Sequence, residues 1–467
     1  MAKTQKAAPT KETRAQKAQR IYQRAITLHQ AGDLNDAIKG YALAIRLAPK
    51  SSDIYNNLGV ALRASGRPEA ALACYRRSLA ITPGSASVYT NMGNALHDLG
   101  ENTRAVEAHR RAVVNAPKSA KTYYNAGRAL ADVGQSQDAL DHFGRAIKLQ
   151  SDYQAAQLQH GETLLRLGDW PQGFKELEVR LSLPNRDPRR KDIPTWDGEQ
   201  LDGKTILINY EGDEGVLIQY LRFMRELKKM GARVLVECPP HFNQLLKASP
   251  DIDATPNLGA DLKHVDVQIP LLSLPGRLGI NVKNVPAQEG YLPIPNFAGQ
   301  QLDIHPDIRL AVGLVWSGEW AGRSTNGPIR PSDVKLEDLA ELFGIPNIQL
   351  VSLELGHGTK DVTRLGLQPL IDQVGSSMMD VADMAGIIEQ LDLVICVDSV
   401  AAHVAGAMGK PVWMLTKPGA NWCWLEDQDN SPWYASMNIF RKGADHSWAD
   451  IASSLRLTLV NILKGTA

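Results

Sequence analysis

The sequence contains only four cysteines, Cys74, Cys238, Cys396 and Cys423, and they are widely scattered. No two of them form a CxxC pair, so the pattern favours neither a disulfide framework nor a thiolate zinc site. No apolar run reaches the roughly 20 residues needed to cross a bilayer, and the N-terminus lacks the apolar core of a secretion signal. These absences predict a reducing, cytoplasmic location, with residues 1–17 as a disordered basic lead-in.

An excess of charge of one sign is also lacking, because Lys plus Arg and Asp plus Glu both number 51. The balance gives no general electrostatic reason to bind nucleic acid or an anionic membrane. The acidic pairs at Asp251 and Asp427 lie outside any strand-end context that suits a metal, so we interpret them as surface acids and expect no metal site. A chain of 467 residues is too long for one ordinary core, and two or three domains are expected.

A repeat of 34 residues fills the first part of the chain, marked by Pro49, Pro83 and Pro117. Within one period, an apolar stripe recurs at the i, i+3, i+4, i+7 spacing of a helix. The stripe consists of Tyr55, Leu58, Gly59 and Leu62, then Tyr89, Met92, Gly93 and Leu96, then Tyr123, Ala126, Gly127 and Leu130. Each unit therefore begins with a helix that buries one face.

A second helix in each unit has small, aromatic and small residues in helical spacing, as in Ala139, Phe143 and Ala146. Glycines recur where the first helix should end in a left-handed residue, namely Gly32, Gly66, Gly100, Gly134 and Gly168. These features resemble the tetratricopeptide repeat over residues 18–187, as about five units. The fifth unit departs from the pattern at "GDWPQGFKELEVRL", which is typical of a terminal unit that meets another domain.

Carboxamide side chains precede the apolar pairs of all five units, again 34 residues apart: Gln23, Asn57, Asn91, Asn125 and Gln159. A primary amide can donate to and accept from a peptide group at once, so a ladder of them suits an extended peptide. Asn is also commonplace at this position of the repeat for structural reasons. Peptide binding and a purely structural ladder both remain open on the sequence.

A proline-rich and charged stretch, Ser182–Gly198, breaks any helix, and we expect a linker over 188–203. After it, "KTILINYEGDEG" begins as a buried strand and runs into a glycine-containing loop, and "IRLAVGLVWSGEW" opens in the same way. The further strands "ARVLVEC", "IQLVSLE", "LDLVICVD" and "PVWMLT" alternate with helical segments. This alternation predicts two parallel-sheet lobes, 204–300 and 301–467.

The stretch from Leu391 to Leu415 places Asp398, Ser399 and His403 close together after a buried strand. A hydrolytic set is one interpretation, but Ser399 lacks the GxSxG elbow that exposes a nucleophile. A second is structural, with Asp398 and Ser399 as helix caps and His403 in the core. A third is an anion cradle at a helix N-terminus, where ligands gather in open α/β sheets.

The region "VDSVAAHVAGAMGKPVWMLTKPGANWCWLEDQDNSPWY" resembles the C-terminal signature of heptosyltransferase-like glycosyltransferases, in particular the bacterial tetratricopeptide-repeat proteins that carry such a domain. The resemblance extends over about residues 200–463. It implies a GT-B fold of two Rossmann-like lobes after the all-α solenoid, with a nucleotide-sugar as substrate and no cofactor. By this resemblance, the donor's diphosphate lies against Asp398, Ser399, Val400, Ala401 and His403.

Further donor-side residues follow from the same resemblance. At the first strand of the second lobe, Trp316, Ser317, Arg323 and Arg330 are candidates for the phosphates, although a loop with two arginines is often solvated surface. Lys417, after the strand "PVWML", can reach the same anion.

On the acceptor side, relatives place a catalytic Asp in the loop after the first strand, and here that position holds Val216. Glu211 matches a Glu of the family, while Asp213 or Glu214 can supply a base from a shifted loop. We therefore expect a glycosyltransferase whose solenoid recruits a protein acceptor, flagellin-like or another target of O-glycosylation. The alternative is a non-catalytic protein–protein interaction scaffold with a degenerate transferase domain.

Overall fold

The computed structural model describes residues 12–184, 187–286, 290–292, 294, 301–318, 334–356, 358–375, 378–443 and 446–465. The chain divides into two compact units, Met1–His160 and Gly161–Ala467. Each unit is considered by itself.

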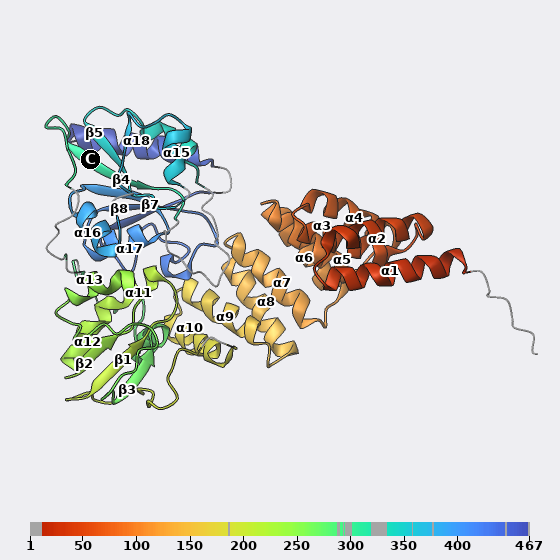
Figure 1. Ribbon diagram of the computed structural model, residues 1–467, viewed down its shortest axis with the longest axis horizontal. Helices are drawn as coiled ribbons and strands as arrows, with labels where there is room; N and C mark the ends of the chain where they lie inside the picture. Colours follow the sequence, from red (N-terminus) through yellow and green to blue (C-terminus); the bar gives the residue numbers. More distant parts are fainter. Residues whose placement is uncertain are drawn as a thin grey trace, which may run out of the picture. The chain divides into compact units, whose positions relative to one another are not determined.

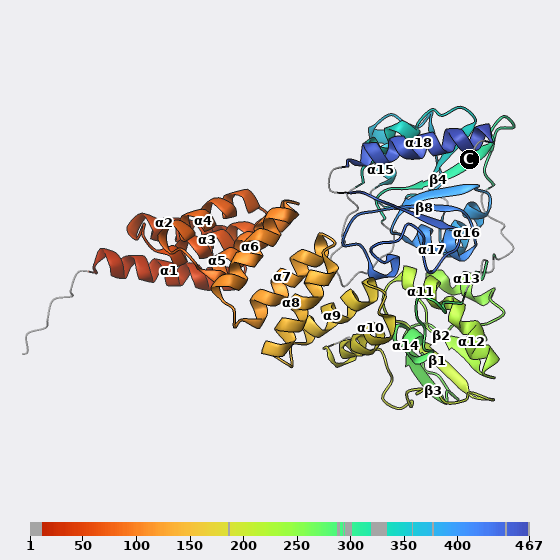
Figure 2. The same ribbon diagram turned by 180° about the vertical axis from the view of Figure 1, so that it is seen from behind.

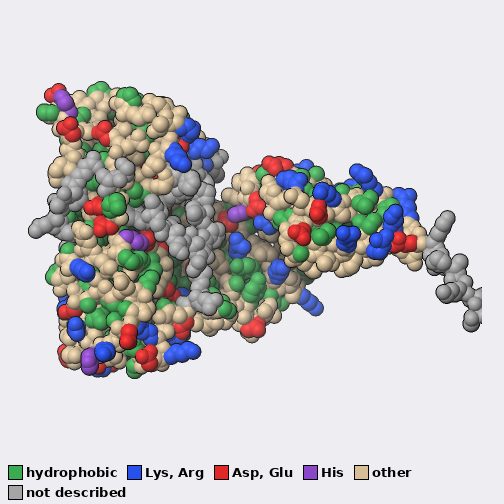
Figure 3. Space-filling model, in the orientation of Figure 1, with side chains coloured by type: hydrophobic (Ala, Val, Ile, Leu, Met, Phe, Trp, Pro, Cys, Tyr) green, Lys and Arg blue, Asp and Glu red, His purple; other side chains and the backbone are tan. Residues whose placement is uncertain are grey.

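The first unit is all-helical, and its helices pack as consecutive antiparallel pairs (Figure 1). Its helices are α1 (Arg14–Gln30), α2 (Leu34–Leu47), α3 (Ser52–Ala64), α4 (Pro68–Ile81), α5 (Ala86–Asp98), α6 (Asn102–Asn115), α7 (Ala120–Asp132), α8 (Ser136–Leu149) and the start of α9 (Gln154–Arg166). The helical repeat predicted from the 34-residue period is confirmed. On the face drawn in Figure 3, basic and acidic side chains are intermixed over these helices.

The turn glycines adopt the predicted left-handed conformation, with φ between 74° and 89° at Gly32, Gly66, Gly100, Gly134 and Gly168. Glycines inside the first helices have a different role, because the aromatic ring of the second helix lies directly on them. A Cβ on Gly59 would lie 2.5 Å from the Tyr75 ring, and one on Gly127 would lie 2.7 Å from Phe143. The small residue is therefore required for the two helices of a pair to approach.

The second unit begins within α9 and includes α10 (Trp170–Leu177) and the 3-10 helix η1 (Glu178–Ser182). Trp170 is fully buried and stacks on Trp433, with ring centroids 4.8 Å apart, while Phe174 meets Trp422 edge-on. This aromatic packing explains why the fifth unit departs from the repeat pattern. Its second helix presents large rings to the α/β part of the chain.

Two parallel sheets form the core of this unit, one of three strands in the order β2-β1-β3 and one of six in the order β6-β5-β4-β7-β8-β9. The strands are β1 (Thr205–Asn209), β2 (Arg233–Val236), β3 (Val267–Pro270), β4 (Leu310–Val315), β5 (Ile348–Ser352), β6 (Ile371–Gln373), β7 (Leu393–Val397), β8 (Val412–Thr416) and β9 (Met437–Arg441). The prediction of an α/β region with parallel sheets is thus confirmed among the described residues.

Helices cover both sheets, and α11 and α17 pack on each other between them (Figure 2). The helices are α11 (Glu214–Tyr220), η2 (Leu221–Phe223), α12 (Met224–Lys229), η3 (Pro240–Phe242), α13 (Asn243–Lys247), η4 (Leu271–Ser273), α14 (Leu274–Arg277), η5 (Leu336–Leu342), α15 (Thr359–Arg364), α16 (Val381–Glu389), α17 (Val400–Ala407), η7 (Trp422–Trp424) and α18 (Trp448–Lys464). The helix expected after β1 is interrupted by the 3-10 turn η2, where Arg222 Nε donates to the carbonyl oxygen of Gln219 at 2.8 Å.

The stretch expected to be a linker is ordered where it runs along β3. Trp196 N–H donates to the carbonyl oxygen of Gln268 and Gln268 N–H donates to that of Pro194, both at 2.8 Å. The Gln268 side chain donates to the carbonyl oxygen of Arg190, and Trp196 is buried. These bonds complete the edge of the smaller sheet.

Candidate functional site

The turn between β7 and α17 has the geometry of a capped helix N-terminus. Ser399 is extended, with φ −158°, and its Oγ accepts a hydrogen bond from Ala402 N–H at 3.3 Å. The amides of Val400 and Ala401 belong to the first turn, whose N–H groups have no acceptor within an α-helix. Together with the helix dipole, this turn can receive an anion at the carboxyl edge of the larger sheet.

His403 lies one turn further along and is only 4% exposed. Its Nδ1 is 2.8 Å from Tyr434 Oη, and its Nε2 is 3.7 Å from Asp398 Oδ1. The imidazole also packs on the Trp424 ring, with centroids 5.1 Å apart. Both ring nitrogens thus face groups other than the Ser399 hydroxyl, an arrangement unlike the nucleophile–base pair of a hydrolase.

The N-terminal turns of α11 and α17 meet at Gly215 and His403. A Cβ on Gly215 would lie 2.4 Å from His403 Cδ2, 2.7 Å from its Nε2 and 3.3 Å from Asp213 Oδ1. Only glycine allows the imidazole to approach the α11 backbone so closely. Asp213, which follows β1, lies beside Gly215 at this contact, and Asp398, which follows β7, faces the imidazole.

The three carboxylates predicted as bases have different surroundings. Glu211 receives two hydrogen bonds from the buried guanidinium of Arg180, at 2.7 and 2.9 Å. Glu214 is buried, and its Oε1 lies 2.8 Å from His241 Nε2. Asp213 is exposed and caps α11, since its Oδ1 accepts from the N–H of Val216 at 2.9 Å. Asp213 is therefore the one of the three that a substrate can reach directly.

The end of β4 already holds a carboxylate. Glu354 is fully buried, and one of its oxygens accepts from the N–H groups of Trp316 and Ser317, both at 2.5 Å. The other accepts from Ser317 Oγ at 2.5 Å. The backbone N–H groups of Trp316 and Ser317, two residues predicted to face the phosphates, are thus bonded to Glu354, which was not predicted. The sequence pattern that could have indicated it is an acidic residue two positions after the strand Ile348–Ser352, in "IQLVSLE".

Other predicted donor-side residues are less informative. Arg323 and Arg330 lie outside the described residues. Lys417 is exposed directly after β8, at the same sheet edge as Asp398.

Burial determines the electrostatics around the turn. It raises the pKa of the Cys423 thiol well above its ordinary value, and the nearby carboxylates of Asp398 and Asp213 raise that pKa further. Burial likewise raises the pKa of Cys396 and of Tyr434. Both thiols therefore stay protonated and are unsuited to act as nucleophiles.

Arg222 follows α11, near the smaller sheet, and contacts residues near the larger one. It was not among the site residues predicted from the sequence. It is 2% exposed, and its Nη1 donates to the carbonyl oxygen of Trp433 at 2.6 Å. The guanidinium lies 4.7 Å from the Tyr291 ring centroid and 5.1 Å from that of Tyr434. A buried Arg inside "QYLRFMRE" gives no sequence signal of such a role, because the same pattern suits a solvated helix face.

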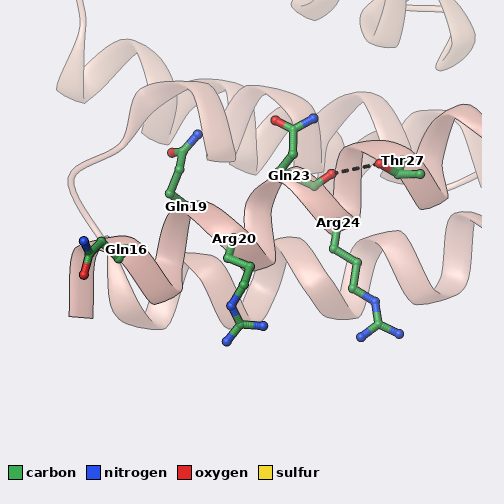
Figure 4. A pocket seen from close by; sticks show the side chains of 6 residues that line it. All are labelled: Gln16, Gln19, Arg20, Gln23, Arg24 and Thr27. Carbon is green, nitrogen blue, oxygen red and sulfur yellow. Dashed lines mark hydrogen bonds between the residues drawn. The ribbon is translucent and has the colours of Figure 1, made fainter. Parts of the chain in front are cut away.

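In the first unit, the carboxamide ladder is partly bonded to its own solenoid. Asn57 Nδ2 donates to Tyr22 Oη at 2.7 Å, and Asn91 Nδ2 donates to Asn56 Oδ1 at 3.0 Å. Gln23 is exposed. An open hollow of about 680 Å³ beside α1 is lined by Gln16, Gln19, Arg20, Gln23, Arg24 and Thr27 (Figure 4). Arg20 and Arg24 point away from the amides in that view.

Among the described residues, no group of three or more His, Cys, Asp or Glu side chains is arranged to hold a metal ion. In the same part of the chain, no helix is both long and apolar enough to cross a membrane.

Comparison with known proteins identifies the first unit. Models described as tetratricopeptide repeat match residues 15–84, 51–113 and 124–178. A curated relative, protein FlbA of Caulobacter vibrioides, is 24% identical over 320 residues, which cover 62% of this chain and 52% of FlbA. The chain thus spans about half the length of that relative.

Solved structures match part of the chain. MamA (residues 41 to the end) from Desulfovibrio magneticus RS-1 is 19% identical, with a TM-score of 0.34, covering 37% of this chain and 98% of that one. Pseudomonas aeruginosa PilF is 16% identical, with a TM-score of 0.36, covering 47% and 88%. On the strength of the repeat-model matches, the N-terminal region of this chain contains tetratricopeptide repeats.

Proposed function

We propose that the C-terminal unit is a metal-independent glycosyltransferase of the GT-B type, which transfers a sugar from a nucleotide-sugar to an acceptor. The single observation that carries the proposal is the meeting of α11 and α17 at Gly215 and His403. It sets an exposed carboxylate, Asp213, beside a capped helix N-terminus at Ser399. A base and an anion seat on opposite sides of one contact are what a displacement at a sugar carbon requires.

In this mechanism the acceptor hydroxyl attacks the anomeric carbon of the sugar. Asp213 accepts the proton of that hydroxyl as the new C–O bond forms. The bond from the anomeric carbon to the diphosphate breaks, and its electron pair leaves with the nucleoside diphosphate, so configuration inverts. Glu211 is held by Arg180 and Glu214 by His241, and we assign these two acids to positioning the loop.

Negative charge grows on the leaving diphosphate, and the first turn of α17 stabilises it. The hydroxyl of Ser399, the amides of Val400 and Ala401 and the imidazole of His403 supply donors, and the partial positive charge of the helix N-terminus adds to them. Removing one donor in such a role typically lowers the rate by about 10²- to 10³-fold.

The acceptor we propose is a protein segment held by the solenoid, flagellin-like or another O-glycosylated protein. Tetratricopeptide repeats indicate protein partners, and the ladder offers exposed or half-buried carboxamides from Gln23 to Gln159. Each amide can bond to one peptide group of an extended chain.

A non-catalytic scaffold is the second candidate function. Glu354 favours it, because this carboxylate already holds the Trp316 and Ser317 amides and repels a second anion there. Val216 at the expected position of the base also favours it.

Nucleotide binding distinguishes the two candidates. Thermal unfolding of the full chain would be measured with a panel of nucleoside diphosphates and nucleotide-sugars. The transferase proposal expects at least one of them to raise the melting temperature, because a ligand that binds only the folded state stabilises it. Ser399→Ala should abolish this increase.

Ser399→Ala also removes a helix cap, which costs about 1 kcal/mol by itself. Ser447→Ala is the matched control, since Ser447 caps α18 by the same bond, to Asp450 N–H at 3.2 Å. It should lower the melting temperature similarly and leave the ligand-induced increase intact. An increase that survives in Ser399→Ala, or none with any nucleotide, would reject the donor site.

A further inference from the structure

A buried cation lies against the aromatic residue that contacts His403. The Arg222 guanidinium is 5.1 Å from the Tyr434 ring centroid and 5.4 Å from that of Trp433. Its bonds run to neutral oxygens: the carbonyls of Gln219 and Trp433, at 2.8 and 2.6 Å, and Tyr291 Oη at 3.2 Å. The positive charge is therefore balanced by dipoles and ring faces, and its field acts fully on the neighbouring phenol.

Tyr434 and His403 form a hydrogen bond whose direction the distance alone does not define. Tyr434 Oη lies 2.8 Å from His403 Nδ1, and either atom can carry the hydrogen. Burial and the neighbouring Tyr291 raise the pKa of Tyr434, and Arg222 opposes that increase, so the hydroxyl is a better donor and a poorer acceptor than it would be without this cation. Arg222 thus favours the arrangement in which Tyr434 donates to Nδ1.

The surroundings of the other ring nitrogen of His403, Nε2, independently favour the same tautomer. His403 Nε2 lies 3.7 Å from Asp398 Oδ1, and a carboxylate favours a hydrogen on the nitrogen that faces it. Nε2 is also the nitrogen on the Gly215 side, 2.7 Å from where a Cβ of that residue would lie.

We propose that Arg222 and Tyr434 are positioning residues that fix His403 in the tautomer with hydrogen on Nε2, so that this N–H points toward the α11–α17 contact. The relay runs from Arg222, beside α11, through Tyr434 to His403 of α17.

The role of this relay rests on the proposed function. In that function, the Nε2–H of His403 donates a hydrogen bond to the leaving diphosphate. A histidine with hydrogen on Nδ1 would instead turn a lone pair toward that anion and repel it. The affinity of this turn for a nucleotide should therefore depend on Tyr434, which acts through His403 and does not itself contact the ligand.

Nitrogen-15 NMR of the full chain with labelled histidine tests the tautomer without any ligand. His403→Gln removes one of the histidine signals and so assigns it. We expect the wild-type His403 signals to be those of the Nε2–H form with an Nδ1 that accepts a hydrogen bond. In Tyr434→Phe, the Nδ1 signal should move toward that of an unbonded nitrogen.

Tyr220→Phe is the matched control, because Tyr220 is also fully buried beside Trp433 and no partner is described for its hydroxyl. It should leave the His403 signals unchanged. A wild-type spectrum of the Nδ1–H form, or no change in Tyr434→Phe, would overturn the relay.

Nucleotide affinity measured on the same proteins separates this inference from the proposed function. If a nucleotide binds wild type, Tyr434→Phe should weaken it by roughly tenfold and Tyr220→Phe should not. Equal affinity in both variants would overturn the positioning role. No binding by wild type, with the expected spectra, would overturn the proposed function and leave the tautomer assignment standing.

Discussion

His109 should make the solenoid sensitive to mild acid. It occupies the aromatic position of the third repeat, 34 residues after Tyr75 and 34 before Phe143, and it is 3% exposed. A Cβ on Gly93 would lie 2.5 Å from its Nε2, so the imidazole packs on Gly93 as the rings do in neighbouring repeats. Burial lowers its pKa from 6.5 to about 4, with Arg128 adding to the decrease.

The direction of the pH dependence follows from the protonation of His109 in the folded and the unfolded chain. Above about pH 6.5 the imidazole is neutral in both the folded and the unfolded chain, and the free energy of unfolding has its full value. As pH falls toward about 4, the unfolded chain binds a proton that the folded chain does not, so stability is lost. The difference between pH 7.5 and pH 5 amounts to about 2 kcal/mol from the pKa shift of His109.

Hydrogen exchange followed by mass spectrometry on α5 and α6 measures this loss in the full chain. Protection of these helices, corrected for the intrinsic pH dependence of exchange, should fall roughly thirtyfold between pH 7.5 and pH 5. His109→Phe, which copies the residue at Phe143, should remove most of the decrease.

The matched control is His97→Gln. His97 is about half exposed and pairs with Asp132 at 3.2 Å, so its loss should leave the acid sensitivity in place. Equal sensitivity in wild type and His109→Phe would refute the assignment to this buried imidazole.

Three further substitutions test the second unit by thermal or urea unfolding. Gly215→Ala should destabilise it by about 1–3 kcal/mol, because the new methyl overlaps His403; an unchanged stability would contradict the contact. Arg180→Met should cost about 3–5 kcal/mol, since it leaves the Glu211 carboxylate, whose side chain is only 11% exposed, without its cation; a loss below 1 kcal/mol would show that the pair is solvated. Trp170→Ala should cost about 3–5 kcal/mol by opening a cavity in the aromatic cluster; retention of full stability would mean that α10 does not pack there.

Two of these substitutions, Gly215→Ala and Arg180→Met, have control variants of the same kind elsewhere in the chain. Gly144→Ala places its methyl 3.7 Å from the nearest atom of His160, so it should be neutral or stabilising. Arg189→Met breaks a half-exposed pair with Asp187 and should cost at most about 1 kcal/mol.

Local chemistry explains what the sequence predicted well. The repeat was visible because Gly32 and its four equivalents need a left-handed φ, and because Gly59 and Gly127 must admit a ring. The parallel strands were visible because "LDLVICV" and its counterparts are apolar on both faces. Ser399 was recognised as a cap by its place between such a strand and a helix.

Contacts between distant segments were not predictable in the same way. Glu354 reaches Trp316 and Ser317 only because β5 lies beside β4, and Arg222 meets Tyr434 across the two sheets. Nothing in the local sequence around either residue encodes its partner. The sequence did not distinguish Asp213 from Glu214 as the base, and only the contacts of Glu211 with Arg180 and of Glu214 with His241 separate the three acids.

The most direct test of the proposed activity is the release of nucleoside diphosphate from a panel of nucleotide-sugars by the full chain. Wild type should release it from at least one donor, faster when a peptide or protein acceptor is present. Asp213→Asn should bind that donor with unchanged affinity and release at least about 100-fold less, because the acceptor proton has no base. Equal release by wild type and Asp213→Asn, or donor binding without release from any member of the panel, would contradict the mechanism.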